Sequence, residues 1–144
     1  MTLRFPLRDL VLAWLVATVF SGLPSTLYAL AVGADPLEAT RAAGAMLLPA
    51  NSGTGMLVAA AALVHPAVSL FWTAVFGVLL PRQHVARWAV AGSAAVALLD
   101  LRLVAPLFFP SVAALPFWPQ CADHLMWGVL LGATLQRGQR RASR

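Results

Sequence analysis

Residues 56–80 read MLVAAAALVHPAVSLFWTAVFGVLL, a run of 25 residues without Asp, Glu, Lys or Arg. An α-helix rises about 1.5 Å per residue, so this run is long enough to cross the roughly 30 Å hydrocarbon core of a bilayer. Only His65 and Pro66 interrupt its apolar character. The run therefore predicts a transmembrane helix and indicates a helical membrane fold.

Three further apolar runs accompany it. Residues 10–32 and 88–109 have similar lengths, and residues 121–136 form a shorter run. The first run is longer than the apolar part of a signal peptide and no Ala-x-Ala site follows it cleanly, which favours a retained span. The prediction is an all-α integral membrane protein in which residues 1–144 form a single domain, a bundle of four transmembrane helices.

The composition agrees with this prediction. Of 144 residues, 60% are hydrophobic and 10% are charged, against roughly 25% charged in soluble domains. A soluble domain of this size could not cover so much apolar surface, which excludes an ordinary soluble enzyme, a disordered chain and a disulfide scaffold. The sequence lacks the motifs of phosphate loops, serine hydrolases and zinc proteases, so we predict no catalytic residues.

The positions of the arginines predict an orientation. The N-terminal segment, residues 81–87 and residues 137–144 carry eight of the ten, whereas the two opposite loops carry only Arg41. Because basic residues are retained on the cytoplasmic side, both termini are expected to be cytoplasmic. The use of Arg without Lys, together with many Ala residues, predicts a bacterial source and therefore a bacterial inner (plasma) membrane. The arginines flank apolar runs, so the expected partner is the lipid bilayer rather than nucleic acid. Residues 137–144 form the expected basic cytoplasmic tail.

The first outer loop contains a helix-start pattern. Asp35, Pro36 and Glu38 stand at the N-cap, first and third helical positions, the arrangement that favours a helix start. We therefore predict a short interfacial helix over residues 36–48, lying at the outer membrane surface. Glu38 and Arg41 stand one turn apart and are expected to pair.

The strongly polar residues of the predicted spans all fall in the outer half of the membrane. Polar groups in hydrocarbon are costly and need a partner, water or a function. Pro24, Pro66 and Pro106 interrupt three spans at similar depth, where each favours a kink. We expect an outer-leaflet polar cavity that is closed at its cytoplasmic end. Its expected lining residues are Tyr28, His65, Asp100, Arg102, Asp123 and His124.

Three functions are compatible with such a cavity. The leading hypothesis is a non-enzymatic protein that binds or passes a small polar solute or a proton. The second is an accessory or structural subunit, in which Asp100 pairs with His65 or Arg102 and Asp123 caps the fourth span. Matched depth makes His65 the expected partner of Asp100. The third is a membrane redox protein whose His65 and His124 ligate a haem or a metal; otherwise no cofactor and no metal ligand is predicted.

Gly128 and Gly132 form a Gly-x-x-x-Gly pattern in the last run. Glycines at this spacing allow two membrane helices to approach closely. The pattern predicts close helix packing, either within the bundle or in a homodimer or larger complex.

Overall fold

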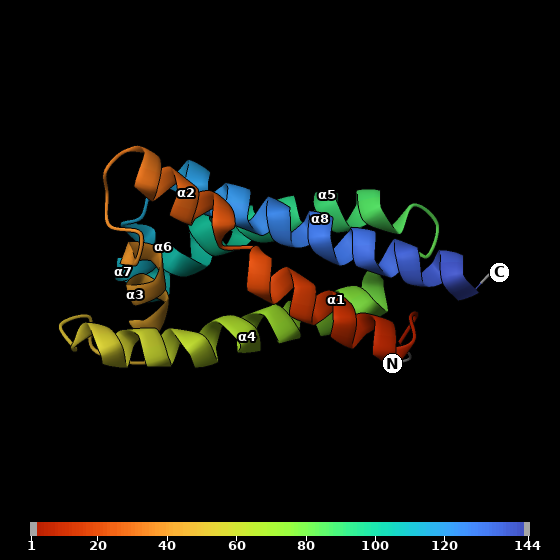
Figure 1. The fold of residues 1–144 in the computed structure, drawn as a ribbon, viewed down its shortest axis with the longest axis horizontal. Coiled ribbons are helices and arrows are strands. Elements are labelled where there is room, and N and C mark those ends of the chain that lie inside the picture. Colours follow the sequence, from red (N-terminus) through yellow and green to blue (C-terminus); the bar gives the residue numbers. More distant parts are fainter. Residues whose placement is uncertain (1–2, 143–144) are drawn as a thin grey trace.

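The computed structural model describes residues 3–142, and every regular element in that part of the chain is helical. The elements are α1 (Leu7–Phe20), α2 (Leu23–Ala31), α3 (Glu38–Gly44), α4 (Thr54–Leu79), α5 (Val85–Leu99), the π-helical segment η1 (Asp100–Val104), α6 (Ala105–Phe108), α7 (Pro110–Ala113) and α8 (Phe117–Ala142). The long helices run along one axis, and α3 lies across one end of the bundle (Figure 1). The start of α1 and the end of α8 lie at the opposite end.

Three helical runs in the described chain are long and apolar enough to cross a membrane. They are Leu7–Ala31, Thr54–Leu79 and Val85–Phe108, which correspond to the first three predicted runs. Helix α8 has 26 residues, as many as α4, but it is more polar because it includes Asp123, His124 and three of the arginines. It extends beyond residues 121–136 at both ends, so the predicted tail is helical as far as residue 142; residues 143–144 lie outside the described residues.

The three prolines act differently on their helices. The first run breaks at residues 21–22, and Pro24 lies in the first turn of α2, where a helix needs no N–H from it. Pro66 stays inside α4. Pro106 follows η1, in which the Ala105 N–H bonds to the Asp100 carbonyl five residues back. Single π-helical turns often occur at functional sites because they change the direction of side chains.

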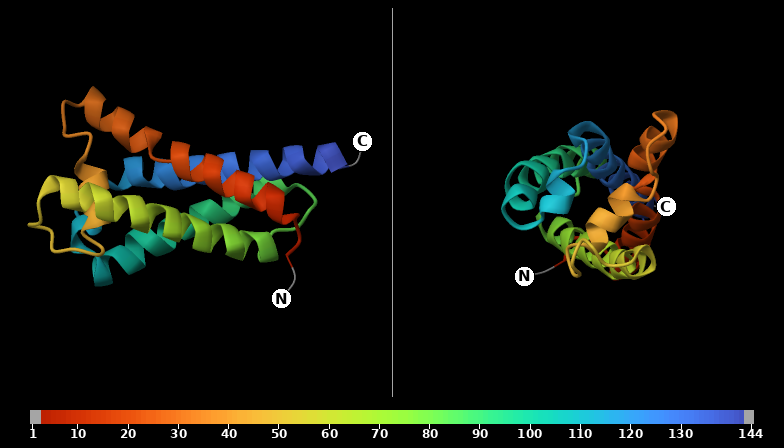
Figure 2. Two further views of the ribbon diagram at one scale, coloured as in Figure 1. Left: turned by 60° about the horizontal axis from the view of Figure 1, so that its bottom comes forward. Right: turned by 90° about the vertical axis from the view of Figure 1, so that its left-hand side faces the viewer.

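The hydrophobic core lies toward the end of the bundle that holds the chain termini. Helix α8 packs on α1, α2 and α5, whereas α4 packs on α1 and α3. The core cluster includes Ala13, Phe76, Ala89, Leu131 and Leu135. At the other end α1 gives way to α2, which leans away from α4 (Figures 1 and 2). The bundle is therefore closed at one end and wider at the other.

Glycines set the approach of α8 to α5. A Cβ on Gly128 would lie 2.8 Å from the Ala89 carbonyl oxygen and against the Ser93 side chain, and one on Gly132 would lie 2.8 Å from the Ala86 Cα. Contacts this short are not found for real side chains, so the two glycines face α5 within the same chain. The two glycines allow α8 and α5 to pack in close contact, and any larger residue at these positions would push the helices apart.

The segment between α2 and α4 differs from the prediction in the length of its helix and in the partner of Arg41. Helix α3 covers Glu38–Gly44 instead of residues 36–48. Arg41 Nη1 lies 2.7 Å from Asp35 Oδ2, so Arg41 pairs with Asp35 and the expected pair with Glu38 is wrong. The other Asp35 oxygen accepts a hydrogen bond from the Leu37 N–H at 2.8 Å. One oxygen of Asp35 thus accepts a hydrogen bond at the start of the helix, and the other pairs with Arg41 in place of Glu38.

Candidate functional site

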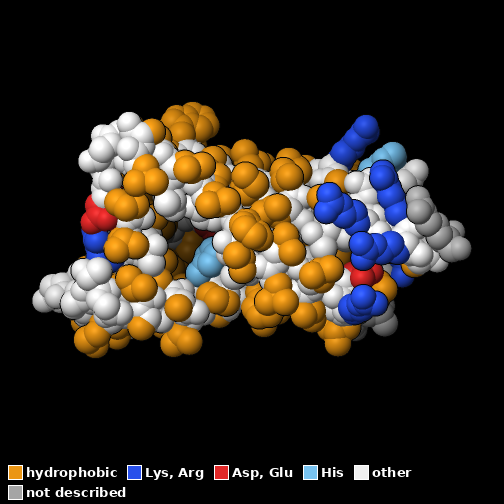
Figure 3. All heavy atoms as spheres, viewed as in Figure 1, with side chains coloured by type: hydrophobic (Ala, Val, Ile, Leu, Met, Phe, Trp, Pro, Cys, Tyr) orange, Lys and Arg blue, Asp and Glu red, His pale blue; other side chains and the backbone are white. Residues whose placement is uncertain are grey.

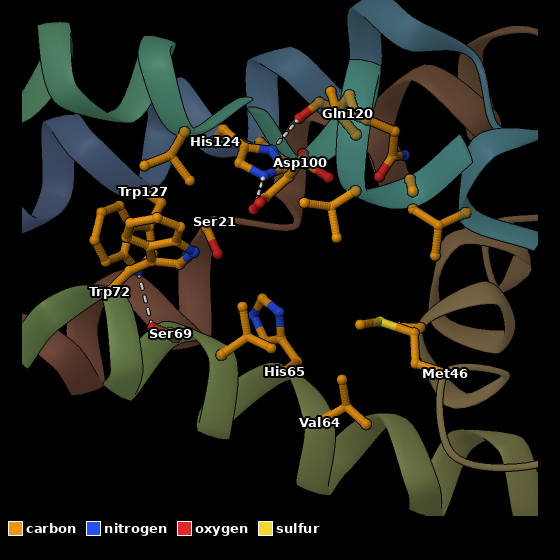
Figure 4. Close-up of a pocket in the computed structure, with 18 of the residues that line it drawn as sticks. Ser21, Met46, Val64, His65, Ser69, Trp72, Asp100, Gln120, His124 and Trp127 are labelled. Atoms are coloured by element: carbon orange, nitrogen blue, oxygen red, sulfur yellow. Dashed lines mark hydrogen bonds and ion pairs between the residues drawn. The ribbon is translucent and has the colours of Figure 1, made fainter. Parts of the chain in front are cut away.

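A cavity of about 480 Å³ lies in the wider end of the bundle. Helix α4 forms one wall, α5, η1 and α8 form the facing wall, and α3 and the junction of α1 with α2 lie at its sides (Figure 4). Its volume is within the range of about 300–1,000 Å³ that is typical of small-molecule sites. Most of the lining is apolar, and the polar groups are Ser21, His65, Ser69, Ser93, Asp100, Gln120, Asp123 and His124.

Asp100 and His124 form the polar centre of the facing wall. Asp100 Oδ2 lies 3.5 Å from His124 Nε2, and each side chain is 26% exposed. His124 Nδ1 lies 2.9 Å from the Gln120 carbonyl oxygen, which can only accept, so Nδ1 carries a proton and donates it. A second proton, on Nε2 or on the carboxyl group, makes the contact with Asp100 attractive. In the neutral ring Nε2 and Asp100 Oδ2 are both acceptors, so the pair favours one positive charge between them, carried by a proton or by a cationic donor.

The η1 segment positions Asp100 in this pair. Asp100 is its first residue, and the wider π-helical turn accommodates an extra residue before Pro106. Because the pair joins η1 to α8, the expected pairing of Asp100 with His65 or Arg102 is wrong.

Asp123 serves a different purpose from Asp100. Its Oδ1 accepts a hydrogen bond from the Ser25 backbone N–H at 2.9 Å. Ser25 lies in the first turn of α2, where N–H groups have no partner within the helix and a nearby carboxylate is favourable. Asp123 therefore caps α2 from α8, and the expectation that it caps the start of its own helix is wrong. The same side chain also lines the cavity.

His65 lies across the cavity from the Asp100 pair (Figure 4). Its Nε2 donates a hydrogen bond to the Thr18 carbonyl oxygen at 3.0 Å, which leaves Nδ1 as an acceptor in the neutral ring. The residue is exposed although it lines the cavity. His65 therefore belongs to the rim, on the side formed by α4.

A hydrogen-bonded floor separates the cavity from the core. Trp127 Nε1 donates to Ser69 Oγ at 2.9 Å, and Ser69 Oγ lies 2.6 Å from Thr18 Oγ1. These contacts join α1, α4 and α8. Sequence reasoning missed this group, although Ser69 stands one helical turn after His65 and therefore on the same face of α4.

Two of the six expected residues lie outside the cavity. Tyr28 borders a separate recess of about 40 Å³ between α2 and the start of α3. Arg102 is exposed, and its guanidinium carbon lies 4.1 Å from the centre of the Phe117 ring, a cation–π contact. The structure brings together His65, Asp100, Asp123 and His124 around the cavity. Arg102 is excluded because its side chain lies over the Phe117 ring, at the exposed surface.

The cavity opens through the side of the bundle. Figure 3 shows a hollow in this face, with a histidine at its edge and hydrophobic side chains on either side. Comparison with Figure 1 places the hollow between α3, α4 and the junction of α1 with α2. Val68 and Phe71 of α4 line the cavity and are 39% and 58% exposed at the surface. The opening is therefore framed by apolar surface, away from the end of the bundle.

No protein-family model, curated protein or solved structure matches this chain. Within residues 3–142, no three His, Cys, Asp or Glu side chains are grouped so as to hold a metal ion. The geometry of the cavity is therefore the basis for a functional proposal.

Proposed function

We propose that this chain is a multi-pass protein of a bacterial inner membrane that binds a small solute in the cavity between α4 and α8. The observation that carries the proposal is a cavity of about 480 Å³ with Asp100 and His124 in its wall. A partly buried acid and histidine in a mostly apolar site at membrane level are costly to maintain without a use. The role is binding, and no catalytic residue is assigned.

The proposal includes α8 as a fourth span. Its polar residues in the outer half contact other parts of the protein: Asp123 bonds to Ser25, and His124 pairs with Asp100. Polar side chains that are satisfied inside a bundle lower the hydropathy of a helix without exposing charge to lipid. The low hydropathy of α8 is therefore compatible with a membrane crossing.

The proposed orientation places both termini in the cytoplasm. Arginine side chains gather at the end of the bundle near the termini (Figure 3). Arg82 Nε donates to the Arg4 carbonyl oxygen at 2.6 Å, and Gln139 Nε2 donates to the Arg82 carbonyl oxygen at 3.2 Å. The N-terminal segment, the loop after α4 and the end of α8 thus lie together, as expected if all three are cytoplasmic.

Binding is better supported than passage. The core cluster, which includes Ala17, Leu131 and Leu135, fills the bundle between the cavity and the arginine-rich end. These three side chains are inaccessible to solvent. Conduction through this state would require the core to separate, whereas binding requires only the lateral opening.

A structural role is the second candidate function, because Asp123 caps α2. In that role the acids only fix the positions of helices. This explains the contact of Asp123 with Ser25 but not the cavity, nor the placement of Asp100 and His124 in its wall. The two functions therefore differ in whether the cavity takes a ligand.

Three compounds that each have a phenyl ring on a four-carbon chain test the proposal. These are 4-phenylbutylamine, 4-phenylbutanol and 4-phenylbutyrate, titrated by calorimetry into the protein in lipid nanodiscs. Val68→Trp places a large ring in the cavity opening, and Leu63→Trp places it on an exposed part of α4 outside the cavity lining. We expect saturable binding of at least one compound, weakened at least tenfold by Val68→Trp and unchanged by Leu63→Trp. No saturable binding, or equal effects of the two substitutions, would contradict a ligand site here.

A further inference from the structure

We infer that the cavity takes an organic cation, a protonated amine on an apolar body, which enters from the lipid. This inference rests on the proposed function and specifies its ligand. The first argument is charge: the lining contains two carboxyl groups, Asp100 and Asp123, and among the described lining residues none is Lys or Arg, so a proton on His65 or His124 is the positive charge that these side chains supply. Carboxylates held in an apolar site favour a positive partner. A cationic ligand supplies one.

Hydrogen bonding points in the same direction. Both histidines donate one ring N–H to a backbone carbonyl, His65 to Thr18 and His124 to Gln120. Their ring donors are used by the protein when the rings are neutral, so the lining offers mainly acceptors. The acceptors include the carboxylate oxygens of Asp100 and the second ring nitrogen of His65. A ligand that donates several hydrogen bonds matches this lining, and an ammonium group donates up to three.

The aromatic residues of the lining can contact both the positive charge and the apolar body of such a ligand. Trp72 and Trp127 both line the cavity and lie close together in Figure 4. The Trp127 N–H is occupied by Ser69, so this indole presents its ring rather than its donor. Tryptophan faces attract cations more strongly than other aromatic faces do. Around these rings, Val64, Val96 and Val104 extend the apolar lining, which suits a hydrocarbon or aryl body.

The lateral opening specifies the route. The opening is bordered by Val68 and Phe71, which are exposed on the apolar side of the bundle. If α4 spans the membrane, this opening faces lipid tails in the outer leaflet. A ligand that arrives there must partition into the membrane, so it needs an apolar body as well as its cationic group. An inorganic cation or a fully polar amine does not meet this requirement.

The three phenylbutyl compounds separate this inference from the proposed function. Each has a phenyl ring on a four-carbon chain, which in the acid includes the carboxylate carbon, and they differ in charge at neutral pH: the amine is a cation, the alcohol is neutral and the acid is an anion. We expect the dissociation constant of 4-phenylbutylamine to be at least tenfold lower than that of 4-phenylbutanol, and 4-phenylbutyrate to bind most weakly. Equal affinities, or tighter binding of the alcohol or the acid, would overturn the cation assignment while a ligand site remains. If none of the three binds, the proposed function fails as well.

Asp100→Asn provides the matched substitution. It removes the negative charge and keeps the shape, so we expect at least a tenfold loss of affinity for 4-phenylbutylamine and no change for 4-phenylbutanol. Glu38→Gln makes the same chemical change outside this cavity and should alter neither affinity. An equal loss for the amine and the alcohol in Asp100→Asn would contradict a charge role. If this variant does not fold, the order of affinities in the unsubstituted protein decides the question alone.

Discussion

Asp100 Oδ2 on η1 lies 3.5 Å from His124 Nε2 on α8, which is a direct polar contact between these two elements at the cavity wall. Each residue depends on a different local structure. Asp100 is the first residue of the π-helical turn, and the Gln120 carbonyl holds the His124 ring through Nδ1. The contact therefore couples the shape of the third apolar run to the position of α8.

Removing this contact should give non-additive losses of stability. Asp100→Asn and His124→Gln are each expected to lower the free energy of unfolding in detergent by about 1–3 kcal/mol, because each leaves a partly buried polar group with a poorer partner. The double variant should lose less than the sum of the two, by about 0.5–3 kcal/mol. Denaturant titration of the four proteins measures this coupling.

The control pair is Asp100→Asn with His65→Gln. His65 bonds to Thr18 and lies across the cavity, so the losses should add to within about 0.5 kcal/mol. Coupling of His65 and not of His124 to Asp100 would contradict the observed pairing.

Asp123 should contribute to stability through α2. Asp123→Ala removes the acceptor of the Ser25 N–H, and loss of a helix cap costs about 0.5–2 kcal/mol. Asp123→Asn keeps an acceptor oxygen and should cost less. Thermal unfolding in detergent measures both, and equal losses in the two variants would indicate that the hydrogen bond is not the stabilising feature.

Gly128 should not tolerate a methyl group. Gly128→Ala would place Cβ 2.8 Å from the Ala89 carbonyl oxygen and against Ser93, forcing α8 away from α5 at a cost of about 1–3 kcal/mol. Gly55→Ala is the matched control, since a Cβ there meets nothing within 4 Å and alanine favours a helix. A large drop in the unfolding midpoint is expected for the first variant and none for the second.

Hydropathy was sufficient to predict three helical runs, because length and apolar character are local properties of the sequence. It also placed the polar residues at similar depth, and four of them line one cavity. Depth does not define the direction in which a side chain points around its helix. Because of that direction, Asp100 contacts His124 and not His65, and Arg102 contacts the Phe117 ring.

The remaining differences also come from non-local contacts. The π-helical turn adds a residue that regular periodicity does not predict, and it rotates all residues that follow it. The sequence predicts that Asp123 caps its own helix, but its hydrogen-bond partner is Ser25, 98 residues away. The fourth membrane crossing and the bilayer orientation stay predictions.

Asp35 should titrate at unusually low pH. The hydrogen bond from the Leu37 N–H, and after it the bond with Arg41, lower the pKa of the Asp35 carboxyl group below its ordinary value of 3.8. The folded state thus favours the ionised form. This carboxylate stabilises the fold fully above about pH 3.8, and the contribution is lost as the pH falls through the lowered pKa.

Carbon-13 NMR of the Asp35 side chain measures the midpoint. We expect a value below 3.8 in the unsubstituted protein. In Arg41→Gln the midpoint should rise without reaching 3.8, because the Leu37 N–H is the larger cause and stays in place. A midpoint at or above 3.8 in the unsubstituted protein would contradict the loop geometry.

The fourth crossing and the orientation can be tested together by cysteine labelling. In a Cys121→Ser background, single cysteines replace Asn51, Gln83 and Ala142. A membrane-impermeant maleimide is then applied to intact bacterial cells and to lysed cells. The arginine distribution predicts that position 51 is labelled in intact cells and position 83 only after lysis.

Position 142 decides whether α8 crosses the membrane. Gln139 donates to the Arg82 carbonyl oxygen, so the end of α8 and the loop at residue 83 lie on the same side. α5 and the segments that follow it run from this loop to the opposite end of the bundle, and α8 returns to the loop (Figure 1). If α5 crosses a membrane, we therefore expect α8 to cross it as well. Position 142 should therefore behave like position 83. Labelling of position 142 in intact cells while position 83 stays protected would mean that α8 does not cross. Labelling of both positions in intact cells would reverse the orientation on which the lipid-facing opening in the outer leaflet depends.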